Sequence, residues 1–283
     1  MAGSGFGTNF RITTWGETHG AGVGVVVDGC PAGLPLERED VQKYLDRRKP
    51  GQSKYTTQRK EGDQVEILSG IFEGRTTGTP ISMVVYNKDQ RSKDYSNIKD
   101  IYRPGHADFT FDMKYGFRDY RGGGRSSGRE TIGRVAAGAV AAKVLKELGI
   151  EIKAYAKAIA GIEVSKDYFD FAEMNNNPFN MPDKEAAKLV QEKADQMIKE
   201  MDSIGGIIEC QITGMPVGIG ETVFDKLDAE LSKAIMSIGS VKGFEIGDGF
   251  EAANLRGSEN NDDIICVDGK VEKETNHSGG VLG

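Results

Sequence analysis

Residues 130–148 constrain the fold most, because they carry the clearest helical periodicity in the chain. Small and aliphatic side chains recur there at the spacing of one helix face, which predicts a helix packed against a core. Gly149 comes directly afterwards and is the residue type that most often follows the end of a helix. The predicted apolar face consists of Val135, Ala136, Ala139, Val140, Val144 and Leu145.

The rest of the chain mixes strand and helix patterns. Short runs rich in β-branched residues and bounded by Gly or Pro predict strands, and amphipathic runs at helical spacing predict helices. A segment rich in Asn and Pro predicts a surface loop. We predict strands at residues 21–28, 64–68 and 80–86, helices at residues 37–48 and 184–201, and the loop at residues 173–182.

One short pattern occurs twice. Residues 29–34 (GCPAGL) and residues 214–219 (GMPVGI) share the form Gly-x-Pro-x-Gly followed by an aliphatic residue. Each copy lies between a β-rich run and an amphipathic helix. The repetition is consistent with two related halves, and it is equally consistent with one favoured strand-to-helix turn. The sequence leaves both interpretations open.

The composition indicates a folded, soluble protein. A chain of 283 residues with 38% hydrophobic content can bury a sizeable core. It has no run of about 18 apolar residues, and residues 1–10 lack the order of a signal peptide. We therefore expect a cytoplasmic protein that does not bind membranes. The three cysteines, Cys30, Cys210 and Cys266, are widely separated, which argues against a disulfide framework and against a zinc site.

The charge is unevenly distributed. A net charge of -7 disfavours binding to nucleic acid. Residues 47–60 nevertheless contain six basic residues and no acidic one, and six arginines lie between Arg103 and Arg134. A solvated basic loop is the usual explanation of such a run. The alternative is a binding site for a substrate with several negative charges.

The three histidines, His19, His106 and His277, all sit among glycines and small polar residues. His19 lies in GETHG and His106 in RPGHAD, on predicted turns where an imidazole can act as an acid or a base near neutral pH. A single loop histidine is usually ordinary surface. Two such motifs beside arginines favour catalysis.

Residues 120–131 (YRGGGRSSGRET) come directly before the strongest predicted helix. The backbone N–H groups of such a loop and the N-terminus of the following helix can bind an anion, and arginine adds paired donors for phosphate or carboxylate. The segment matches neither the P-loop nor the dinucleotide-binding pattern. An RNA-binding Arg-Gly segment is the alternative, which the acidic composition disfavours.

The segments GETHGAGVGVVVDGCPAG, DRRKPGQSKYTTQR, RPGHADFT and YRGGGRSSGRET, in this order and spacing, resemble the chorismate synthase family. The resemblance covers essentially all 283 residues. It implies an α+β fold, a β-α-β sandwich with helices between antiparallel sheets, in a single domain over residues 1–283 that assembles as a homotetramer. Family members continue past the NHSGG loop to a Gly-Arg-His-Asp-Pro motif that this sequence lacks. We therefore expect a chain without the C-terminal part of the family domain.

The resemblance implies a lyase at the seventh step of the shikimate pathway, which leads to the aromatic amino acids. Its small-molecule substrate, 5-enolpyruvylshikimate 3-phosphate, loses phosphate and a ring proton by trans 1,4-elimination to give chorismate. Reduced FMN is required, and we expect NADPH or another external reductant, with a flavin reductase as a partner, because no NAD(P)H domain is visible. The alternatives are a catalytically silent fragment and a non-enzymatic anion- or RNA-binding module.

The same resemblance suggests roles for individual residues. His19 would lie near the departing phosphate and His106 near the flavin, which makes both candidate catalytic residues. Gly239-Ser240 stands where Asn-Ala is common, so that only a backbone contact would be retained there. The candidate substrate-binding residues are Arg48, Lys54, Arg103, Ser127, Gly128 and Arg129. The candidate flavin-binding residues are Arg125, Ser126, Ser127, Gly239, Ser240 and Gly279, and no metal is expected.

Overall fold

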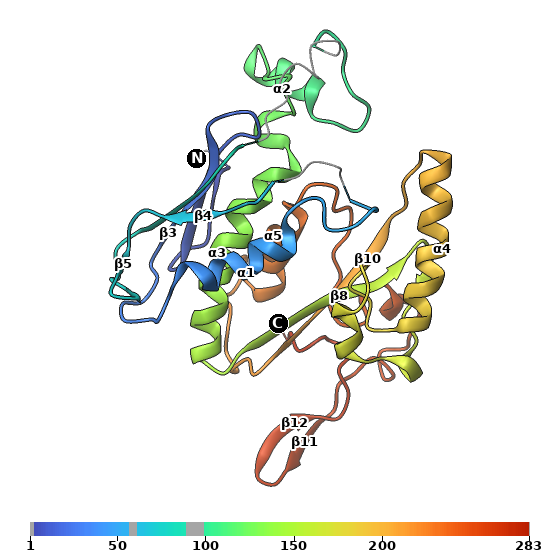
Figure 1. The fold of residues 1–283 in the computed structure, drawn as a ribbon. Helices are drawn as coiled ribbons and strands as arrows, with labels where there is room; N and C mark the ends of the chain where they lie inside the picture. Colours follow the sequence, from blue (N-terminus) through green and yellow to red (C-terminus); the bar gives the residue numbers. More distant parts are fainter. Residues whose placement is uncertain (1–2, 57–60, 89–98, 283) are drawn as a thin grey trace. The chain divides into compact units, whose positions relative to one another are not determined.

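The computed structural model describes residues 3–56, 61–88 and 99–282 (Figure 1). The chain divides into two compact units, Met1–Met215 and Pro216–Gly283. Helices and antiparallel sheets occur together, as the sequence predicts for a mixed α and β protein. Within the described residues, no helix combines the length and the apolar character that crossing a bilayer requires.

A five-stranded antiparallel sheet forms the scaffold of the first unit, in the order β1-β2-β3-β7-β4. Strand β3 is central, and its Val23, Val25 and Val27 are almost completely buried. Such a continuous valine run is typical of a strand that is covered by other elements. The five strands are β1 (Gly5–Phe6), β2 (Arg11–Gly16), β3 (Gly22–Asp28), β4 (Val65–Ile67) and β7 (Ile81–Tyr86), and a separate small hairpin joins β5 (Ile71–Phe72) to β6 (Arg75–Thr76).

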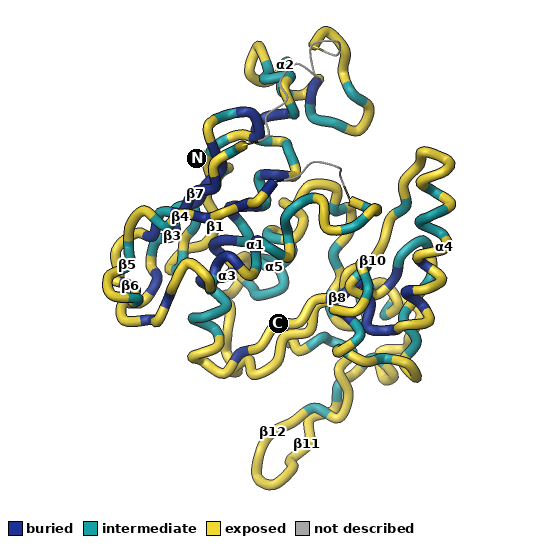
Figure 2. Tube along the Cα trace, viewed as in Figure 1, coloured by how far each residue is buried: buried dark blue, intermediate teal, exposed yellow. Residues whose placement is uncertain are grey.

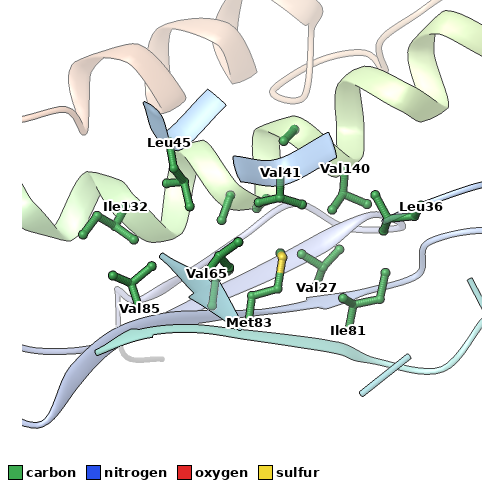
Figure 3. Packing of buried hydrophobic residues seen from close by; sticks show 14 of the residues in the cluster. Val27, Leu36, Val41, Leu45, Val65, Ile81, Met83, Val85, Ile132 and Val140 are labelled. Atoms are coloured by element: carbon green, nitrogen blue, oxygen red, sulfur yellow. The ribbon is translucent and has the colours of Figure 1, made fainter. Parts of the chain in front are cut away.

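Helices α1 (Arg38–Arg48) and α3 (Thr131–Glu147) pack on one face of this sheet (Figure 3). Their apolar faces meet the sheet valines and Met83 in one core cluster. Gly133 allows α3 to approach closely, since a Cβ there would lie 2.9 Å from Thr14 Cγ2 and 3.1 Å from the carbonyl oxygen of Gly24. The start of α3 is therefore held against β2 and β3, which fixes the loop that precedes it.

A second antiparallel sheet has the order β10-β8-β9, and α3 contacts its strand β8 as well as the first sheet. A small cluster around Met181 and Val190 packs beneath helix α4. Asp183 caps α4 by accepting hydrogen bonds from the backbone N–H groups of two residues in its first turn. The elements are β8 (Glu151–Ile159), β9 (Ile162–Glu163), β10 (Gly206–Thr213) and α4 (Lys184–Glu200).

The two copies of the repeated pattern adopt the same backbone conformation. Gly29 and Gly214 have φ values of 81° and 77°, and Gly33 and Gly218 have φ values of 84° and 88°. All four lie in the left-handed region that favours glycine. The shared turn is therefore confirmed as local geometry, while an origin by duplication stays a prediction.

The second unit contains helix α5 (Leu227–Met236), a 3₁₀ segment at Gly249–Asn254 and a hairpin of β11 (Ile264–Val267) and β12 (Lys270–Lys273). Figure 2 shows that this hairpin is exposed along nearly its whole length, whereas buried residues gather along β3 and β7 of the first unit. Whether the two units form one domain over residues 1–283 stays a prediction.

The predicted helices agree with the observed ones to within one or two residues at each end, and the predicted strands agree equally well. Several elements were not predicted, among them β1, β2, β8 and the short helix α2 (Asp108–Tyr115). The first four residues of β8 are all exposed, so it lacks the apolar run by which β3 was recognised. The Asn-rich loop at 173–182 is only partly a surface feature, because Met181 within it is completely buried.

Candidate active site

Three consecutive glycines form the centre of the candidate site. Gly122, Gly123 and Gly124 have φ values of 70°, 86° and 53°, in the region that residues with a Cβ rarely adopt. A Cβ at Gly122 would lie 2.6 Å from Cδ2 of His19, and a Cβ at Gly123 would lie 2.7 Å from Nε2 of His106. The two imidazoles therefore pack directly on adjacent glycines of one loop.

His19 lies in the turn of residues 17–20 between β2 and β3. The turn is closed by a hydrogen bond of 3.1 Å from the N–H of Gly20 to the carbonyl of Glu17. His19 is only 7% exposed and its neighbour Thr18 only 5%. The ring is thus held inside the protein next to the glycine loop, and it is not the ordinary surface histidine that was the alternative.

His106 precedes α2 and lies beside a buried carboxylate. Its Nδ1 is 3.0 Å from Oδ1 of Asp108 and 3.2 Å from Nη2 of Arg103. Arg103 donates to Asp108 from its backbone N–H, its Nε and its Nη2 at 2.8 to 3.0 Å. These bonds from Arg103 hold the pKa of Asp108 well below its usual range. Because Nδ1 faces Asp108, Nε2 is the nitrogen that His106 directs at the glycine loop.

Arg48 and Arg129 share one carboxylate. Arg48, the last residue of α1, donates from Nη1 to Oδ2 of Asp63 at 2.7 Å, and Arg129 donates from Nη1 to Oδ1 of Asp63 at 2.8 Å. The side chain of Asp63 is completely buried. A carboxylate between two guanidinium groups reduces their repulsion and fixes the position of both.

Arg129 is itself enclosed by polar partners. Its side chain is 5% exposed, its Nε donates to Oδ1 of Asn87 at 2.8 Å, and its Nη2 lies 3.6 Å from Oε2 of Glu61. Each of its three guanidinium nitrogens thus faces a protein oxygen. Glu61 and Asp63 directly follow the basic segment 47–60. That segment contains no carboxylate itself, but carboxylates lie beside its Arg48 and beside Arg129 in the folded chain.

The residues between the glycines and α3 form two 3₁₀ turns, Gly124–Ser126 and Gly128–Glu130. Arg125 ties the first turn to β2 by donating from Nη2 to Oγ1 of Thr14 at 2.6 Å. Ser126 donates to the carbonyl of Gly123 at 2.7 Å, and the hydroxyl oxygen of Ser127 accepts the N–H of Arg129 at 3.3 Å. These bonds tie the loop to β2 and to its own backbone.

Lys54 has a different partner from the arginines. Its Nζ lies 2.6 Å from Oδ1 of Asp195 in α4, and both side chains are largely exposed. The hydrogen bond from Lys54 lowers the pKa of Asp195. Arg59 and Lys60, which belong to the same basic run, lie outside the described residues.

Gly239, Ser240 and Gly279 lie in the second unit. Ser240 has a φ of 70°, an uncommon conformation for a residue with a side chain. Gly279 follows a turn organised by Asp262, which accepts hydrogen bonds from the N–H of His277 at 2.7 Å and from the N–H of Ser278 at 3.0 Å. These residues are therefore held in defined loops of their own unit.

The site contains residues that sequence reasoning did not single out: Glu61, Asp63, Asn87 and Asp108. Asp108 stands in the motif RPGHAD beside His106, which could have indicated it. Asp63 and Asn87 have no such local signal, because their partner Arg129 is 66 and 42 positions away. The site therefore places guanidinium groups, a side-chain type that can pair with anions, near two imidazoles, a side-chain type that can donate or accept a proton.

Comparison with known proteins gives one consistent result. The sequence model of one family, described as chorismate synthase, matches residues 10–283. Chorismate synthase of Lachnospira eligens is 70% identical over 283 residues, which cover all of this chain and 77% of that protein. Chorismate synthase of Chloroflexus aggregans is 57% identical over 284 residues, covering 100% of this chain and 78% of that protein.

A crystal structure of chorismate synthase superposes with a TM-score of 0.81 at 33% identity, covering 98% of this chain and 80% of the other. The likeness in structure confirms the predicted α+β fold. Together the sequence and structure comparisons favour an enzyme over a non-enzymatic anion- or RNA-binding module. The chain, which carries the two histidine turns and the arginine-rich loop before α3, therefore belongs to the chorismate synthase family, whose members are lyases of the shikimate pathway.

Proposed function

We propose that the elimination of phosphate from 5-enolpyruvylshikimate 3-phosphate takes place at the glycine loop of residues 122–124, with reduced FMN as the cofactor. The observation that carries this proposal is the packing of His19 and His106 on adjacent glycines of the segment that continues to Arg129. Two imidazole rings, which can donate or accept a proton, and a buried guanidinium group suit a reaction that removes a phosphate and a proton from a trianion.

The residues around the loop fit a flavin. A Cβ at Gly128 would meet no heavy atom within 4 Å, so the backbone there borders open space, and the following helix favours an anion at its N-terminus. Arg125, Ser126 and Ser127 would hold the cofactor, and Gly239, Ser240 and Gly279 are further candidates in the second unit. When bound, reduced FMN would supply electron density and an acceptor for the ring proton.

The substrate carries two carboxylates and a phosphate, which call for fixed cations. Arg48 and Arg129 would bind anionic groups from the positions that Asp63 gives them. The other candidates for substrate contacts are Lys54, Arg103, Ser127 and Gly128. Guanidinium groups that are already oriented need no rearrangement when the charge on the leaving group grows.

The two histidines would have separate tasks. His19 would donate a proton to the departing phosphate, an effect that contributes about 10² to 10⁴ in rate for a well-placed general acid. His106, with Nδ1 beside Asp108 and Arg103, would compensate charge near the flavin through Nε2. His19→Ala and His106→Ala should each lower kcat by about this factor.

The test uses the protein with 5-enolpyruvylshikimate 3-phosphate and FMN under reducing conditions, and it follows chorismate absorbance together with released phosphate. Equal amounts of both products are expected, and phosphate without chorismate contradicts the proposal. Lys143→Gln is the control for the histidine variants. It breaks an ion pair of 2.5 Å with Asp40 between α1 and α3, and neither residue is a candidate for the site. It should leave turnover unchanged.

We further propose a homotetramer in the cytoplasm that receives electrons from NADPH or another reductant through a separate flavin reductase. Family membership supports these points, since this chain is 70% identical to one chorismate synthase. Sedimentation equilibrium tests the tetramer. Turnover with NADPH and FMN alone, without a reductase, would contradict the need for a separate enzyme.

A further inference from the structure

Asn87 lies where the central strands of the first sheet meet the turn that carries His19. It follows the last residue of β7, and its backbone N–H donates to the carbonyl of Ala21 at 3.1 Å. Because β7 pairs with β3 from Gly22 onward, this bond continues the ladder by one step into the turn of residues 17–20. The backbone of Asn87 is therefore fixed by the sheet.

The side chain of Asn87 joins two parts of the site. Nδ2 donates to the carbonyl of Glu17 at 2.8 Å and to the carbonyl of Gly20 at 2.9 Å, while Oδ1 accepts from Nε of Arg129 at 2.8 Å. Carbonyls only accept and a guanidinium group only donates, so a single orientation of the amide satisfies all three bonds.

The two bonds from Nδ2 hold both ends of the turn that contains His19. The turn has one backbone hydrogen bond of its own, from Gly20 to Glu17, and a bond of 3.3 Å from the N–H of Glu17 to the carbonyl of Gly22. Asn87 thus adds two side-chain hydrogen bonds to those that the backbone of this turn forms. They hold the backbone from which the His19 side chain projects.

The third bond fixes Arg129 relative to the same turn. Asp63 and Glu61 hold the Nη atoms of Arg129, whereas Asn87 holds Nε and is the one described side chain that bonds both to this guanidinium and to the turn. Asn87 is therefore a direct link between the two groups, beside the contact of His19 with Gly122 in the loop that continues to Arg129.

We propose that Asn87 is a positioning residue that aligns His19 with Arg129 for the elimination, and this inference rests on the roles proposed above for those two residues. Asn87 touches neither substrate nor cofactor in this proposal. It acts by keeping the proton donor and the anion-binding group in a fixed relation, which matters because a displacement of about 1 Å can lower a rate about 10²-fold.

Two substitutions separate the two halves of this role. In Asn87→Asp the carboxylate keeps an acceptor for Arg129 but cannot donate to the turn, so kcat should fall about 10- to 100-fold with little change in the KM for substrate. In Asn87→Leu both connections are lost. The same fall in kcat should then be accompanied by a raised KM.

Asn177 provides the matched control. Its amide also clamps a turn in the first unit, donating from Nδ2 to the carbonyls of Glu173 and Met181 at 2.8 Å, and it has no contact with the site. Asn177→Asp should lower the melting temperature about as much as Asn87→Asp does, with kcat and KM unchanged. An equal loss of kcat in the two variants would overturn the proposal.

A double variant decides whether Asn87 acts through His19. If it does, His19→Ala with Asn87→Asp should be no slower than His19→Ala alone, because the ring to be aligned is already absent. Losses that multiply would overturn the positioning role. Wild-type turnover in His19→Ala would instead contradict the proposed function. This outcome is distinct from a failure of the positioning role, because Asn87 is unchanged in that variant.

Discussion

Arg48 and Lys54 are six positions apart in the same basic segment, yet they meet carboxylates in opposite surroundings. Arg48 pairs with Asp63, whose side chain is completely buried, and shares it with Arg129, whose side chain is 5% exposed. Lys54 pairs with Asp195, and the side chains of that pair are 58% and 37% exposed. Water therefore reaches both partners of the Lys54–Asp195 pair, whereas in the Arg48–Asp63 pair it reaches Arg48, which is 20% exposed, but not Asp63.

The difference shows how one cationic segment can serve two purposes. The buried group is preorganised: its charges are held before any ligand arrives, and removing one member leaves the others without solvent. The exposed pair can open to meet a ligand, since an ion pair in water gains little. Within the described part of this basic run, Arg48 is thus held by a buried partner and Lys54 by an exposed one.

Asp63→Asn should have the largest effect on stability. It leaves Arg129 buried with its charge compensated by Glu61 at 3.6 Å, and removing one partner of a buried pair costs about 3 to 5 kcal/mol. Urea denaturation measures this as a lower midpoint. Lys143→Gln breaks the pair with Asp40 between α3 and α1, whose side chains are 26% and 24% exposed, and should cost much less. Equal losses in the two variants would mean that the complete burial of Asp63 adds nothing to the cost of breaking its ion pairs.

Asp108→Asn should have an intermediate effect that depends on pH. Asp108 is 3% exposed, and the bonds from Arg103 keep its pKa in the folded protein below that of the unfolded chain, which is about 3.9. Between these two values the unfolded state binds more protons, so the stabilisation is complete above about pH 4 and declines as the pH falls further.

The difference in unfolding free energy between wild type and Asp108→Asn should therefore be about 1 to 3 kcal/mol at pH 7 and should shrink below about pH 4. Denaturant titrations at a series of pH values check it. A difference that grows towards acid pH would mean that Asp108 is not held as a carboxylate by Arg103.

The elements that could be predicted from the sequence are those whose buried residues form a continuous periodic pattern. The apolar face of 130–148 became α3, observed as Thr131–Glu147, and the valine run became β3, because each buries one continuous surface. Strand β8 was missed, since four exposed residues in succession at its start give no such pattern. Local periodicity reports burial, so it is weak where a sheet face is exposed.

The candidate site was predictable in its cations and histidines but not in what holds them. The resemblance to a family pointed to His19, His106 and Arg129, which have recognisable neighbours in the sequence. Asp63 and Asn87 act on Arg129 across 66 and 42 positions, and no spacing rule connects them. Which carboxylates pair with these arginines can therefore be identified from the structure but not from the sequence.

Lys54→Gln should have the smallest effect, and it tests the exposed half of the comparison. The unfolding free energy should not change measurably, because both partners are hydrated. Substrate affinity should fall by at most about fivefold, and less at high salt, which screens exposed charges.

Asp195→Asn should shift affinity the other way, since it frees Lys54 from its bond of 2.6 Å for an incoming anion. Isothermal titration with substrate at two salt concentrations measures both. If Asp195→Asn weakens binding as Lys54→Gln does, the pair acts as a fixed structural unit, and Lys54 belongs with the arginines after all.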